Sequence, residues 1–123
     1  MDIAAIVLQS LLALAFVGAG ISKLAGVKAH VDNFNHWGLP QWFRIVTGLV
    51  EVAGAAALVV GFWEPSWAAA GALWLAVTML VAILVHVRVK DSLKLTFPSI
   101  FLFVLPAALL IIEWDALADF PGF

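Results

Sequence analysis

The sequence has no cysteine and few charged residues, and both absences restrict the possible function. Without a thiol the chain can form no disulfide and offers no thiolate nucleophile, so redox or metal chemistry would have to come from a partner or a bound molecule. Charged residues make up 11% of the 123 residues, against about 25% in soluble domains, and 65% are hydrophobic. This composition excludes a soluble globular protein. A net charge of −2 gives no basic footprint for a nucleic-acid partner.

Four apolar runs have the length of about 20 residues that crosses a bilayer core, at positions 3–24, 41–62, 67–87 and 95–114. The connections at 25–40, 63–66 and 88–94 are short, so residues 1–123 form a single domain. The first run lacks a preceding positive region, and we interpret it as a mature helix rather than a signal peptide. The sequence predicts an all-α membrane protein, a bundle of four transmembrane helices.

The positions of the basic residues predict an orientation. Every Lys and Arg lies in or beside the first and third connections, namely Lys23, Lys28, Arg44, Arg88, Lys90 and Lys94. The positive-inside rule therefore places these connections in the cytoplasm and both termini on the non-cytoplasmic side of a multi-pass protein in the cytoplasmic membrane. The segment 27–37 mixes apolar and polar residues at roughly helical spacing. We expect it to lie on the cytoplasmic headgroups between helices 1 and 2.

Small residues and prolines suggest how the helices pack. Small residues recur at a spacing of four on the second run, at Ala53, Ala57 and Gly61, and on the third, at Ala68, Ala72 and Ala76. These two stripes predict an antiparallel contact between the two helices. Gly18 and Gly20 offer a similar close contact on the first run. The same stripes are compatible with a homo-oligomer. Pro98 is expected in the first turn of the fourth helix, and Pro106 in its middle, where it should kink the helix.

Glu51 is the residue that most needs an explanation, because it is the eleventh of the 22 residues in the run 41–62 and so lies near the bilayer midplane. Thr47 and Gly54 share its helix face, whereas Arg44 lies about 10 Å away along the axis, too far for a direct pair within the helix. Desolvation favours a protonated Glu51 that donates a hydrogen bond to a neighbouring helix or a bound molecule. Glu51 is either a proton-linked or ligand-binding acid or an interhelical hydrogen-bond peg.

Four basic residues fall within the cytoplasmic turns of their helices, and they could form a polar ring below Glu51: Lys23, Arg44, His86 and Arg88. The alternative is that they only snorkel to the interface and set the topology. His86 has a further interpretation, because a neutral imidazole at the inner membrane face can bind a quinone head group, transfer a proton or ligate a metal. A single histidine with a structural partner is the competing interpretation.

Other constellations are weaker. His30, His36 and His86 together offer three nitrogens, yet no HxxxH lies on a spanning helix and no acidic cluster stands beside them, so no metal site is assigned. No phosphate loop, Ser-His-Asp set or paired-carboxylate site is present, and we assign no catalytic residue.

A short, degenerate set of motifs runs through nearly the whole chain: Phe16, Gly20 and Lys23; Gly38-Leu39-Pro40; Thr47, Gly48, Glu51 and Gly54; His86, Arg88 and Asp91. In these residues the chain resembles the DoxX-like membrane family. The resemblance implies a small four-helix protein of the cytoplasmic membrane. Relatives look like subunits of membrane oxidoreductase systems, including the small subunit of thiosulfate:quinone oxidoreductase and a mycobacterial complex with superoxide dismutase and a sulfurtransferase. More distant relatives look like cargo receptors or receptor-assembly chaperones, so the resemblance fixes the fold better than the activity.

Three functional hypotheses follow. The leading one is an accessory membrane subunit of an oxidoreductase system that holds a quinone or a lipid between the helices, with Glu51 and Thr47 facing the cavity and Lys23, Arg44 and His86 at its mouth. The second is a small proton-coupled transporter using Glu51, since four helices and one central carboxylate look like the small multidrug resistance type. The third is a structural or assembly scaffold. In each case the bilayer is a partner, and the first adds the subunits of a membrane oxidoreductase.

Overall fold

The computed structural model describes residues 3–123, and all regular secondary structure in that range is helical. The elements are α1 (Ile3–Leu24), α2 (Lys28–His36), α3 (Gln41–Val60), α4 (Pro65–Arg88), α5 (Leu93–Ile112) and α6 (Trp114–Leu117). Four of these helices, α1, α3, α4 and α5, are long and apolar enough to cross a membrane. The prediction of an all-α, four-span bundle is therefore confirmed.

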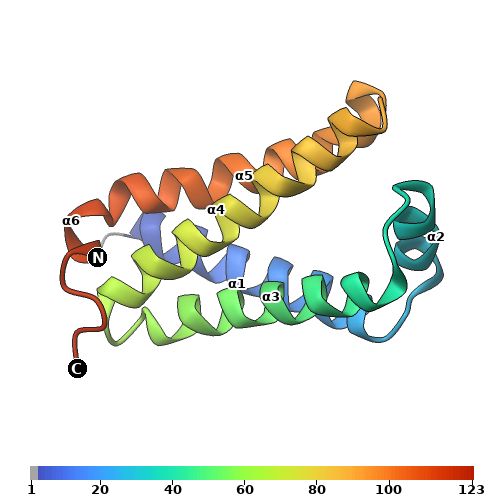
Figure 1. Cartoon of the computed structure of the whole chain (residues 1–123). Helices are drawn as coiled ribbons and strands as arrows, with labels where there is room; N and C mark the ends of the chain where they lie inside the picture. Colours follow the sequence, from blue (N-terminus) through green and yellow to red (C-terminus); the bar gives the residue numbers. More distant parts are fainter. Residues whose placement is uncertain (1–2) are drawn as a thin grey trace.

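The four long helices form two pairs. Figure 1 shows α1 running beside α3 and α4 running beside α5, with the pairs close together at the end that carries α6 and apart at the end that carries α2. We call these the α6 end and the α2 end. The C-terminus and the start of α1 lie at the α6 end (Figure 1). The bundle is thus narrow at one end and open at the other.

Helix boundaries follow from local sequence signals. Gly26 and Gly38 flank α2 with φ of +74° and +71°, a backbone conformation that glycine adopts without steric cost. Pro65 begins α4, where its missing N–H costs nothing, so the helix starts two residues before the predicted span. The Ser92 side chain caps α5 by accepting from the Leu95 N–H. The start at Leu93 makes Pro98 an interior residue of α5, and its predicted place in the first turn was wrong.

Close backbone approaches hold the helices together. A Cβ added at Gly20 would lie 2.8 Å from the Gly48 carbonyl oxygen, so α1 and α3 pack through paired glycines. Gly61 packs in the same way against Ala68 of α4, as the small-residue pattern predicts. That pattern was one residue off at its other end, because Ala53 is exposed and Gly54 is buried instead. Gly54 leaves room for Leu75 of α4, whose side chain would lie 2.5 Å from a Cβ at this position.

Apolar side chains lie on both the inside and the outside of the bundle. The interior core contains Leu12, Phe16, Leu58, Leu75 and Leu109, drawn from all four long helices. Large apolar residues also remain exposed along each of these helices, among them Leu14, Leu49, Val77 and Val104. A surface of this kind requires a hydrocarbon solvent. The chain is a multi-pass membrane protein.

Candidate functional site

A cavity of about 530 Å³ occupies the space between the diverging helix pairs. Residues from all of α1 to α5 line it, and most of the wall is apolar, as at Val46, Val50, Val81, Val85 and Leu102. The ionisable side chains of the wall fall into two groups, one around Glu51 and one around Asp91, and Asn33, Thr78 and Ser99 add neutral polar groups. The cavity is thus a largely apolar chamber whose ionisable groups lie at two places.

The first group is an ion pair between α1 and α3. The Lys23 ammonium lies 2.9 Å from Glu51 Oε1, and the two side chains are 14% and 1% exposed. Glu51 Oε2 is buried and has no hydrogen-bond partner. The glycine contact makes the pair possible, because a Cβ on Gly48 would lie 3.2 Å from the Cβ of Lys23 and would crowd the lysine stem. The Lys23 ammonium favours the ionised carboxylate while burial opposes it, and the cavity wall presents an ammonium donor beside a carboxyl oxygen acceptor.

Arg44 does not lie at the cavity mouth where the sequence places it, whereas Thr47 lines the cavity beside Glu51. Arg44 is 9% exposed, and its guanidinium donates to the Gln41 side chain at 2.8 Å and to the Lys23 carbonyl at the end of α1. This carbonyl lies in the last turn of α1 and also accepts from the Gly26 N–H at 3.3 Å, so Arg44 adds to the cap of α1 and stays behind the cavity wall. Thr47 does line the cavity, while its hydroxyl donates to the Phe43 carbonyl of its own helix.

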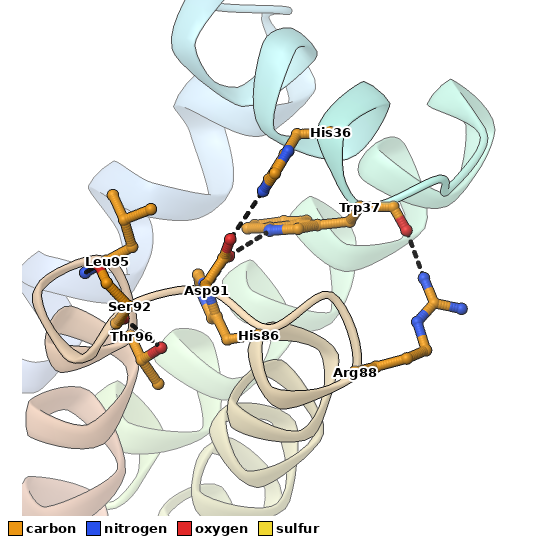
Figure 2. Close-up of polar contacts among 8 residues, drawn as sticks. All are labelled: His36, Trp37, His86, Arg88, Asp91, Ser92, Leu95 and Thr96. Atoms are coloured by element: carbon orange, nitrogen blue, oxygen red, sulfur yellow. Dashed lines mark hydrogen bonds and ion pairs between the residues drawn. The ribbon is translucent and has the colours of Figure 1, made fainter.

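The second group surrounds Asp91 in the link between α4 and α5. Figure 2 shows the side chains whose polar atoms converge on the Asp91 carboxylate. His36 Nε2 lies 2.7 Å from Oδ1, and His86 Nδ1 lies 2.7 Å from Oδ2. The Trp37 indole donates to Oδ2 at 3.3 Å, and the Arg88 guanidinium donates to the Trp37 carbonyl. We call His36, Trp37, His86 and Asp91 the Asp91 cluster. It joins the α2 segment to the α4–α5 link across the open end of the bundle.

The Asp91 carboxylate has a full set of partners. Its side chain is 4% exposed, yet the hydrogen bond from His36, together with those from His86 and Trp37, lowers the pKa of Asp91 below its ordinary value despite burial. An ionised Asp91 accepts only, so His86 donates from Nδ1 and, when neutral, has an acceptor at Nε2. His86 is therefore an oriented histidine in the cavity wall rather than a lone one.

His30 lies near the first group but contacts a different residue. Its Nε2 is 2.9 Å from the Ser22 hydroxyl. Burial, with a smaller effect from the charges of Lys23 and Arg44, lowers the pKa of His30 and favours the neutral ring. Within residues 3–123, no group of three His, Asp or Glu side chains is arranged to hold a metal ion, and His36 and His86 instead contact the Asp91 carboxylate directly.

The structure thus brings together most of the residues that the sequence singled out, but in two groups rather than one ring. Lys23, Thr47, Glu51 and His86 line one cavity, whereas Arg44 lies behind its wall. Two contacts had no signal in the spacing of residues along the chain. These are the Lys23–Glu51 pair, which joins two helices, and the Asp91 cluster, which needs α2 to fold back over the bundle.

Comparison with known proteins agrees with these features. The model of the DoxX-like family matches residues 7–108, a range that includes both polar groups of the cavity. The chain is 34% identical over 88 residues to the uncharacterized protein YdgD of Bacillus subtilis (strain 168), and the match covers 71% of this chain and 77% of that protein. No solved structure gives a significant match.

Proposed function

Since this chain belongs to the DoxX-like family of membrane proteins, we propose that it is an accessory membrane subunit of an oxidoreductase system and that its cavity binds a quinone or a lipid. The observation that carries the proposal is the cavity itself, an apolar chamber of about 530 Å³ with the Lys23–Glu51 pair in its wall. Binding sites for small molecules are typically of this size, mostly apolar, with a few polar groups that orient the ligand.

We further propose that the α2 end faces the cytoplasm and the α6 end the opposite side of the cytoplasmic membrane. The positive-inside rule supports this, because all six Lys and Arg residues lie toward the α2 end. In this orientation α2 lies at the cytoplasmic interface, and the Asp91 cluster covers the cytoplasmic mouth of the cavity. The chain contributes binding and positioning, and an associated subunit supplies the electron transfer.

Gentle extraction of the tagged protein from its native membrane, followed by mass spectrometry of the proteins and small molecules that co-purify, tests the proposal. We expect a quinone or another amphiphile in amounts close to the protein, together with a stoichiometric oxidoreductase. The variant Glu51→Gln should recover less of the small molecule. A protein recovered with bulk phospholipid alone, from wild type and variant alike, would contradict the proposal.

A vesicle assay separates this function from proton-coupled transport by the same acid. Wild type and Glu51→Gln are reconstituted, a pH gradient is imposed, and uptake of a fluorescent lipophilic cation is followed. We expect the two proteins to give the same uptake as empty vesicles. Uptake that requires both the gradient and Glu51 would assign the residue to a transporter instead.

A further inference from the structure

Two carboxylates line the cavity, and they differ in how their oxygens are satisfied. Both oxygens of Asp91 have partners, supplied by His36, His86 and Trp37. In Glu51 the Lys23 ammonium lies beside Oε1, while Oε2 is buried without a hydrogen-bond partner. The Glu51 side chain is only 1% exposed, so bulk water does not supply that partner. A buried acceptor without a donor is costly, and such groups in native proteins call for an explanation. Glu51 Oε2 is therefore the acceptor in the wall that a bound molecule can satisfy.

We propose that the cavity selects an amphiphile whose polar head carries a hydroxyl group, and that this hydroxyl donates to Glu51 Oε2 while accepting from the Lys23 ammonium. The inference rests on the proposed binding function of the cavity and names the chemical class of the ligand. A hydroxyl is both donor and acceptor, so a single oxygen matches the neighbouring donor and acceptor of the ion pair.

A carbonyl or ether head fits the same place less well. The oxygen of such a head can accept from Lys23, but it has no proton to donate to Glu51 Oε2. Oε2 would then stay without a donor, and the ligand oxygen would face it as a second acceptor. Phenols, alcohols and the reduced quinol form of a quinone belong to the preferred class, whereas ketones, ethers and the oxidised form of the same quinone bind less tightly. The apolar wall, as at Val50 and Val81, accommodates the hydrocarbon part of either class and does not discriminate between them.

A matched pair of probes tests the donor alone. Intact protein in detergent is offered para-octylphenol and its methyl ether in competition, and native mass spectrometry measures the ratio bound, relative to the ratio in empty micelles. Because a hydrogen bond to a charged acceptor is at stake, we expect about a tenfold enrichment of the phenol. Equal enrichment of the two probes would overturn this inference and leave cavity binding intact. Binding of neither probe would count against both the inference and the proposed function.

Variants assign the preference to the ion pair. The double variant Lys23→Met/Glu51→Leu replaces both charges by apolar side chains, a change that a buried pair tolerates better than the loss of one partner. It should bind both probes with the enrichment abolished. The control variant Asp115→Asn neutralises an exposed carboxylate at the α6 end, away from the ion pair, and should keep the wild-type ratio of bound phenol to bound methyl ether. A phenol preference that survives in the double variant would place the selecting group elsewhere and overturn the assignment.

Discussion

The backbones of Gly20 and Gly48 meet so closely that a Cβ on either residue would lie 2.8 Å from the carbonyl oxygen of the other. This contact sets the distance between α1 and α3, and with it the reach of Lys23 toward Glu51. Packing in the bundle and polarity in the cavity are therefore linked through a pair of residues that carry no side chain.

Substitution at this contact should destabilise the bundle. In Gly48→Ala the new methyl group meets the Gly20 backbone, so α1 and α3 must separate, and we expect a loss of about 1–3 kcal/mol, typical of an overpacked interface. Thermal unfolding in detergent, followed by circular dichroism, measures it. Gly18→Ala is the control, because a Cβ there has nothing within 4 Å. Equal melting temperatures for the two variants would contradict the role of the contact.

The ion pair should show strong coupling between its two members. Lys23→Met leaves a buried carboxylate without its counter-charge, which typically costs about 3–5 kcal/mol, and Glu51→Leu leaves a buried ammonium. The double variant should be more stable than either single one. A double-mutant cycle on the free energy of unfolding in detergent measures the coupling. Additive losses would show that the two residues act independently.

Removal of the Asp91 carboxylate charge should loosen α2 without unfolding the bundle. Asp91→Asn weakens the hydrogen bonds from His36 and His86, whereas the contacts of α2 with α1 and α3 remain. We expect faster amide hydrogen exchange in residues 28–37 and little change in the core of α1 and α3. The variant Asp115→Asn provides the comparison. Unchanged exchange in residues 28–37 would mean that the Asp91 cluster does not hold α2.

Acid should destabilise the α2 end through His30. The pKa of this histidine is lowered from its ordinary value of 6.5 by burial and then by the charges of Lys23 and Arg44, so the unfolded state binds the proton more readily. Its contribution is present above 6.5 and is lost as the pH falls through the folded-state pKa. Relative to His30→Asn, wild type should lose stability as the pH falls below 6.5 toward the lowered folded-state pKa of His30. Parallel pH profiles of the melting temperature would contradict this assignment.

The sequence predicts the spans well because each depends only on a continuous apolar run. It also identifies Glu51, since a carboxylate in the middle of such a run stands out whatever surrounds it. The sequence does not identify Lys23 as the partner of Glu51, because Lys23 lies 28 positions away on another helix. The two side chains meet because the Gly20–Gly48 contact brings α1 and α3 close together. Helical spacing assigns faces within one helix, and it does not give the distance between two helices.

For the Asp91 cluster, too, the sequence predicts the local helix but not the contacts that this helix makes with the rest of the fold. The sequence expects an interfacial segment at 27–37, and α2 occupies 28–36. Its inward contacts could not be deduced from amphipathic spacing, because His36 and Trp37 reach Asp91 only through the fold of the Gly38 turn and the α4–α5 link. The one-residue error between Ala53 and Gly54 has a related cause, since the contact of Gly54 with Leu75 is made between helices and does not follow from spacing along one helix.

Helix α4 is longer than the hydrocarbon core of a typical bilayer. The 24 residues of α4 span about 36 Å, against about 30 Å for a hydrocarbon core. Figure 1 shows α4 inclined relative to α3, and this inclination separates the helix pairs at the α2 end. Tilt is one way in which a long helix fits a thinner bilayer, so we expect membrane thickness to influence the angle between the pairs and with it the cavity. Lipid chain length should therefore be held fixed when variants of this protein are compared in bilayers.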